Sequence, residues 1–173
     1  MATKLENLHL EIAHFDHFKQ YIPGYKQCCE RTVEKLLQAG ILQVSTAFEL
    51  ALAKVGQHKM VSADCGDLYK DGVYSDAKLS SVRTCSYGKS YSAPVTNIHN
   101  KTGALRVQVY ERKQNKFYYF SIPHNAYLHI PKTSNIEIPF ELDGTPRRIP
   151  MRSVSQNWWN YEVKSFKLMA VIG

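Results

Sequence analysis

The stretch from Gly66 to Lys78, with the sequence GDLYKDGVYSDAK, decides the fold because it carries a strong β-hairpin signal. Strand-forming residues flank Asp71-Gly72 on both sides. Asp-Gly favours the two-residue turn that joins antiparallel strands. We therefore predict two strands, over residues 60–69 and 73–82, joined at this turn.

The turn also predicts which side chains face each other. In a two-residue turn Lys70 lies opposite Val73, and counting back along both strands then puts Asp67 opposite Asp76. The β-carbons of directly opposed residues lie about 4.5–5.5 Å apart. Strand alternation puts Lys78 on the same face as Asp76. The other face carries apolar side chains that can point into a core, namely Leu68, Val73, Ala77 and Leu79.

Two opposed carboxylates repel each other, so something has to offset the charge of Asp67 and Asp76. Mg²⁺ would do so, because it binds carboxylate oxygens together with waters and substrate phosphates. A lysine beside such a site could orient or deprotonate a water, or stabilise developing negative charge. An ordinary hairpin with polar decoration remains the alternative, since a register shift of one residue would move Asp67 to the other face.

The rest of the chain predicts an α+β fold, in which N-terminal helices precede a mixed, mostly antiparallel β-sheet that carries the active site. Apolar residues recur at helical spacing over residues 26–39 and 46–55. Thr46 and Glu49 match a capping box at the start of the second helix. Alternation predicts strands over 104–111 and 117–122, and residues 83–103 resemble a loop.

Composition and charge bound the class of protein. The 173 residues are 44% hydrophobic, which suits one globular domain. No apolar run approaches the roughly 20 residues of a membrane span. Without a signal-peptide pattern at the N-terminus, we expect a cytoplasmic protein, in a bacterium or a phage-infected cell, whose four cysteines are reduced.

The net charge of +7 is concentrated in the second half of the chain. Eight Lys or Arg residues lie between Lys78 and Lys116, where Glu111 is the only acid. Aromatic residues are interleaved with them, including Tyr91, Tyr110 and Phe117. Basic and aromatic surface together favours a polyanion such as nucleic acid, whereas the charges alone are more commonly those of a solvated face.

The pattern GD-x8-D-x-K, with a hairpin in the gap and a helix before it, resembles the PD-(D/E)XK nuclease superfamily. Gly66-Asp67 stands for the first acidic element, and Asp76-Ala77-Lys78 for the D/E-x-K element. Gly66 replaces the proline that is common there, and Asp76 replaces the more frequent glutamate. The resemblance covers residues 46–82 and implies a restriction-endonuclease-like fold.

The resemblance implies a role for each matching residue. Asp67 and Asp76 would bind Mg²⁺, with the backbone carbonyl of Ala77 as a further ligand, and Lys78 would act near the attacking water. Glu49 on the preceding helix would complete the site, unless its role is the capping box. The family also has a helix after this motif, which is hard to find in residues 83–103.

The resulting hypothesis is a Mg²⁺-dependent, site-specific endonuclease of double-stranded DNA, of the restriction or homing type. One domain, 1–173, would comprise a helical part (1–58), the catalytic hairpin (59–82) and a part for DNA contacts and oligomerisation (83–173). A homodimer or a tetramer would cut both strands. The residues expected to contact DNA are Arg83, Lys89, Asn97, His99, Lys101, Arg106 and Gln108.

Two other functions remain open. A non-catalytic nucleic-acid-binding module would use the same basic and aromatic strip, with the hairpin acids incidental. A repair or junction-resolving nuclease would select nucleic-acid structure instead of sequence. The pair Trp158-Trp159 could stack on bases or pack in a core or an interface.

Overall fold

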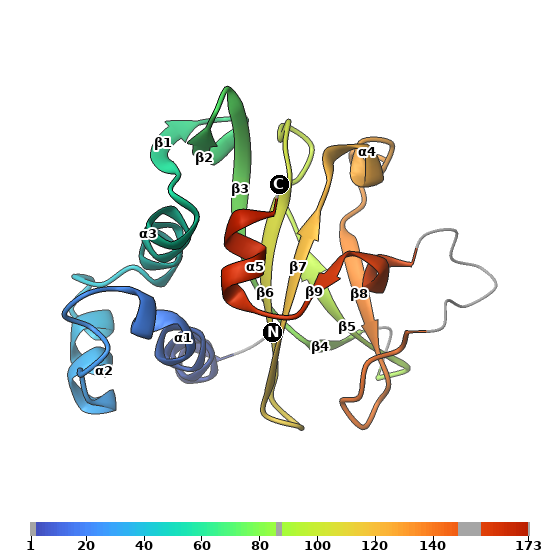
Figure 1. Cartoon of the computed structure of the whole chain (residues 1–173). Coiled ribbons are helices and arrows are strands. Elements are labelled where there is room, and N and C mark those ends of the chain that lie inside the picture. The colour runs from blue at the N-terminus through green and yellow to red at the C-terminus, as the bar shows by residue number, and fades with distance from the viewer. Residues whose placement is uncertain (1–2, 86–87, 149–156, 173) are drawn as a thin grey trace.

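The computed structural model describes residues 3–85, 88–148 and 157–172. Three N-terminal helices lie together on one side of the molecule, and a small sheet lies on the other (Figure 1). The helices are α1 (Lys4–Phe18), α2 (Glu30–Gln38), α3 (Val44–Gly56), α4 (His124–Tyr127) and α5 (Phe166–Val171), with the 3-10 helices η1 (Lys19–Tyr21) and η2 (Trp158–Tyr161). The predicted α+β class is confirmed.

The strands form two sheets. The larger has the order β1-β2-β3-β6-β7-β9, and the smaller has the order β4-β5-β8. Their bounds are β1 (Lys59–Ala63), β2 (Gly66–Lys70), β3 (Val73–Ser81), β4 (Arg83–Cys85), β5 (Ser90–Val95), β6 (Leu105–Glu111), β7 (Lys116–Ile122), β8 (Ile136–Phe140) and β9 (Glu162–Val163). β3 runs parallel to β6, and the other paired strands are antiparallel. The larger sheet is therefore mixed, as predicted.

The two-residue turn between β2 and β3 is present. Asp71 and Gly72 have φ angles of 51° and 83°, as a type I′ turn requires. Lys70 pairs with Val73, and the ladder continues to Leu68 and Ser75. The predicted register is thus confirmed from the turn as far as the pair Leu68–Ser75, which is one step short of Asp67 and Asp76.

Asp76 marks the point where β3 changes its neighbour. Ser75 is the last residue paired with β2, and Asp76 is the first paired with β6, opposite Leu105. The Asp76 amide donates to the Ala104 carbonyl at 2.9 Å. The branch point therefore places Asp76 between β2 and β6, and its side chain is buried.

Two of the predicted segments differ in the structure. The strand expected over 60–69 is split at Asp64-Cys65, where Ala63 pairs with Gly66, into β1 and β2. Residues 83–103, expected as loop, contain β4 and β5 of the smaller sheet. Their pairing partner β8 is distant in sequence, so no local pattern predicts it. Between β3 and β6, the described residues contain no helix.

The larger sheet has a hydrophobic core on each side. One core joins α1, α3 and α5 to the sheet through Phe15, Leu52, Leu68 and Phe166. The other lies between β6–β7 and the smaller sheet, and it contains Trp158 and Trp159. These tryptophans are buried, so they pack in the core. Helix α5 packs in the same core as the N-terminal helices. Residues 1–58 and 83–173, for which we predicted separate roles, therefore share this core.

The predicted capping box on α3 is wrong. The helix begins at Val44 with Gln43 as its N-cap, so Glu49 lies in the second turn and is too far along the helix to cap it. The apolar stripe of α3 predicted its body, but tertiary packing set its first turn. Separately, no helix within the described residues is both long and apolar enough to cross a bilayer.

Candidate active site

Asp76 lies at the centre of a cluster of charged side chains. Its side chain is 1% exposed, and its two oxygens lie 2.9 Å from Lys78 Nζ and 3.1 Å from Lys101 Nζ. Within the described part of the chain, neither oxygen has a partner at a hydrogen-bonding angle. The two lysines therefore offset the Asp76 charge as ion pairs.

Asp67 approaches Asp76 from β2, as the turn register predicted. Its Oδ2 accepts a long hydrogen bond of 3.4 Å from the Ala77 amide. Burial raises the pKa of Asp67, and contact with the Asp76 carboxyl and its negative charge raises this pKa further. The two acids therefore interact unfavourably when both are ionised.

Glu49 reaches the same carboxylates from α3. Burial, followed by the charges of Asp67 and Asp76, raises the pKa of Glu49 to about 7, and Lys101 acts in the opposite direction. Because Glu49 caps no helix end, its position beside the two aspartates is what distinguishes it. The negative charges of Asp67 on β2 and Asp76 on β3 thus act electrostatically on Glu49 of α3.

Ala77 was expected to offer its backbone carbonyl. In a parallel ladder, alternate residues direct both backbone groups toward one neighbouring strand. The Asp76 amide bonds to Ala104 on the β6 side, and the Ala77 amide bonds to Asp67 on the β2 side. The carbonyl of Ala77 therefore faces the side of β3 on which Asp67 lies.

Lys101 is the member of the cluster that sequence reasoning missed. It was predicted to contact DNA, but its side chain is 15% exposed and its Nζ contacts Asp76. The same nitrogen donates to the Asp64 carbonyl at 3.1 Å. Lys101 arrives through the parallel pairing of β3 with β6, so no local spacing could have linked it to the hairpin.

The donor set fits a hard divalent cation. Glu49, Asp67 and Asp76 supply oxygen ligands, their like charges disfavour full ionisation, and the Asp76 oxygens are buried without directed hydrogen bonds. In the part of the chain that the structure describes, no three His, Cys, Asp or Glu side chains are already arranged around a common ion position. The lysines lie against Asp76 instead.

The other residues expected to contact DNA divide into exposed and buried groups. Exposed are Arg83, Lys89, Asn97 and His99. Arg106 and Gln108 are 3% and 0% exposed, so they cannot contact DNA in this structure, and that prediction is wrong for them. Alternation along β6 suggested one solvent-facing side, but the sheet is covered on both faces, and these polar residues point inward.

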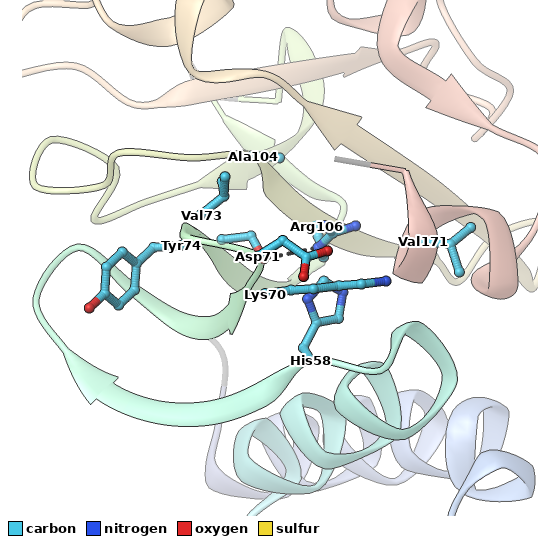
Figure 2. A pocket seen from close by; sticks show the side chains of 9 residues that line it. His58, Lys70, Asp71, Val73, Tyr74, Ala104, Arg106 and Val171 are labelled. Carbon is cyan, nitrogen blue, oxygen red and sulfur yellow. Dashed lines mark hydrogen bonds between the residues drawn. The ribbon is translucent and has the colours of Figure 1, made fainter.

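Arg106 lines a separate hollow of about 250 Å³, where Figure 2 shows it with His58 and Lys70. His58 contacts the Ala170 carbonyl at 2.7 Å, and Lys70 donates to the Gly56 carbonyl at 2.8 Å. Arg106 donates to the Met169 and Ile172 carbonyls. These basic groups cap the carbonyl ends of α3 and α5, which is a structural role.

Geometry and fold together define an α+β protein whose mixed sheet carries a cluster of acids and lysines at a strand branch point. Comparisons of the chain with protein-family models, with curated proteins and with solved structures found no match. The resemblance to PD-(D/E)XK nucleases therefore depends on the motif and on this cluster.

Proposed function

We propose that this protein is a Mg²⁺-dependent endonuclease that hydrolyses phosphodiester bonds in double-stranded DNA, with the PD-(D/E)XK arrangement of residues. The observation that carries the proposal is the meeting of Asp67, Asp76 and Lys78 at the base of the β2–β3 hairpin. The charges of both aspartates act on Glu49, the helical acid that the resemblance implies.

Each residue has a role in this reaction. Asp67, Asp76 and the Ala77 carbonyl would hold Mg²⁺, which, when bound, supplies a water of lowered pKa and offsets the charge of the phosphate. Lys78 donates hydrogen bonds to the phosphate oxygens as negative charge develops there. Glu49, on the preceding helix, would supply a carboxylate that completes the site, as the resemblance implies.

Several features support DNA as the substrate. The chain has a net charge of +7, and Lys89 is an exposed cation of the basic second half. A single site cuts one strand at a time, so we propose a homodimer or tetramer for cutting both strands. A restriction-type or homing endonuclease that acts in the cytoplasm is the role most consistent with this size and charge.

The test is to incubate purified protein with plasmid DNA and Mg²⁺, beside the variants Asp76→Asn and Lys78→Met. We expect the wild type to cut, and each variant to cut at least about 100-fold more slowly, because even groups that only support metal ligands cost 10–100-fold. Asp71→Asn is the matched control, since Asp71 is an exposed turn residue of the same hairpin. It should cut like the wild type.

The products distinguish the alternatives. Discrete fragments indicate sequence specificity, whereas cutting confined to branched substrates indicates a structure-selective nuclease. Binding of DNA without cutting would contradict the proposal and favour a non-catalytic binding module. Normal cutting by both variants would show that the reaction takes place at a different site.

A further inference from the structure

If the proposed function holds, the acidic cluster of Glu49, Asp67 and Asp76 also has a metal-free state, in which only lysines offset its charge. Lys101 lies on the segment between β5 and β6, and its Nζ lies 3.1 Å from Asp76 Oδ1. Lys78 Nζ lies 2.9 Å from Oδ2 of the same carboxylate. Each oxygen of one buried carboxylate therefore has its own ammonium group.

The two lysines are not equivalent. Beyond Asp76, the positive charge of Lys101 lowers the pKa of both Glu49 and Asp67, so its ammonium acts on all three acids. Lys78 also donates to the Asn97 carbonyl at 3.2 Å. Lys101 is the lysine whose charge offsets that of Glu49 and Asp67 as well as pairing with Asp76.

The backbone that follows Lys101 is held by hydrogen bonds and close packing. The Thr102 amide donates to the Cys65 carbonyl at 3.3 Å, and Tyr127 Oη donates to the Gly103 carbonyl at 2.6 Å. A β-carbon at Gly103 would lie only 1.6 Å from the Tyr74 carbonyl oxygen, so the segment packs directly on β3. Any movement of Lys101 therefore takes place in its flexible side chain and not in the backbone.

We propose that Lys101 is the resident counter-cation of the acidic cluster in the metal-free protein, and that Mg²⁺ displaces its ammonium from Asp76 Oδ1. A divalent ion and an ammonium group cannot occupy the same carboxylate oxygens, because their charges repel strongly in a partly buried site. Lys101 thus keeps the three acids folded together without metal, and it competes with the metal for them.

The test measures binding of Mg²⁺ alone, without nucleic acid, by isothermal titration calorimetry. Lys101→Met removes the competing charge at similar length, and we expect it to bind Mg²⁺ about ten-fold more tightly than the wild type. Lys101→Arg keeps the charge and should bind like the wild type. Lys78→Met, on the other oxygen of Asp76, should raise the affinity less than Lys101→Met does.

The inference would be overturned if Lys101→Met bound Mg²⁺ no more tightly than the wild type. If Asp76→Asn at the same time abolished binding, the proposed metal site would remain intact. If neither the wild type nor any variant binds Mg²⁺, both the inference and the proposed function fail. Should Lys101→Met not fold, a crystal structure of the wild type with Mg²⁺ decides the question. Lys101 Nζ still at the Asp76 carboxylate would then overturn the inference, and a displaced Nζ would support it.

Discussion

Glu111 and Asp76 are both carboxylates buried in the larger sheet, 0% and 1% exposed, but their surroundings differ. Glu111 accepts directed hydrogen bonds from Tyr91 Oη at 2.6 Å and from the amides of Lys113 and Gln114 at 2.9 and 2.7 Å. Asp76 has two ammonium groups beside it and no partner at a hydrogen-bonding angle among the described residues.

The difference separates two uses of a buried acid. The donors around Glu111 belong to the backbone of the β6–β7 turn and to a core tyrosine, so they cannot leave without local unfolding. The partners of Asp76 are the ends of long side chains, which can move away when another cation binds. We therefore assign a structural role to Glu111, whereas the surroundings of Asp76 are those that the proposed metal site needs.

The largest expected effect tests the structural role of Glu111. Glu111→Gln places an amide nitrogen against a backbone amide and loses charge-assisted hydrogen bonds, so the free energy of unfolding should fall by roughly 2–4 kcal/mol. Urea denaturation measures this change. Glu141→Gln is the control, because its ion pair with Arg147 is solvated and contributes under about 1 kcal/mol. Equal losses in the two variants would contradict the structural role of Glu111.

The second effect concerns the exchange of partners at Asp76. Mg²⁺ at 100 times its dissociation constant should raise the free energy of unfolding of the wild type by about 2.7 kcal/mol. Asp76→Asn should lose this stabilisation, and EDTA should remove it from the wild type. In EDTA, Asp76→Asn should cost less stability than Glu111→Gln, because lost attraction to the lysines is offset by lost repulsion from Asp67. Equal stabilisation of wild type and variant by Mg²⁺ would contradict the proposed metal site.

The smallest effect is the pH dependence that Glu49 adds in EDTA. Since folding raises the pKa of Glu49 from 4.5 to about 7, the folded protein holds more protons between these pH values. The free energy of unfolding contributed by Glu49 therefore falls as pH rises through this window. The change is modest because Glu49 is half-buried. Denaturation curves of the wild type and Glu49→Gln across this range measure it.

The measurement compares how the free energy of unfolding depends on pH in the wild type and in Glu49→Gln. Burial lowers the pKa of His14 from 6.5 to about 4, so His14 contributes stability that rises with pH over much of the same window. Subtracting the Glu49→Gln profile leaves the Glu49 contribution alone. Identical profiles for the two proteins would show that Glu49 does not interact with the aspartates.

Local chemistry predicted the parts of the site that lie close together in sequence. Asp71-Gly72 determined the turn, the turn determined the register, and the register brought Asp67 to Asp76 with Lys78 beside it. Spacing could not predict the Gln43 cap of α3, because that helix start depends on packing against the other helices. Nor could it predict β4 and β5, whose partner β8 lies far along the chain.

The sequence by itself determined the hairpin, the approach of Asp67 to Asp76 and the α+β class, because a two-residue turn and strand alternation act over a few residues. Only the tertiary structure decided that Lys101 joins Asp76, that Arg106 and Gln108 are buried, and that Glu49 faces the site instead of capping its helix. Each of these depends on the parallel pairing of β3 with β6 or on the packing of helices against the sheet. Such contacts join distant segments and leave no local pattern to read.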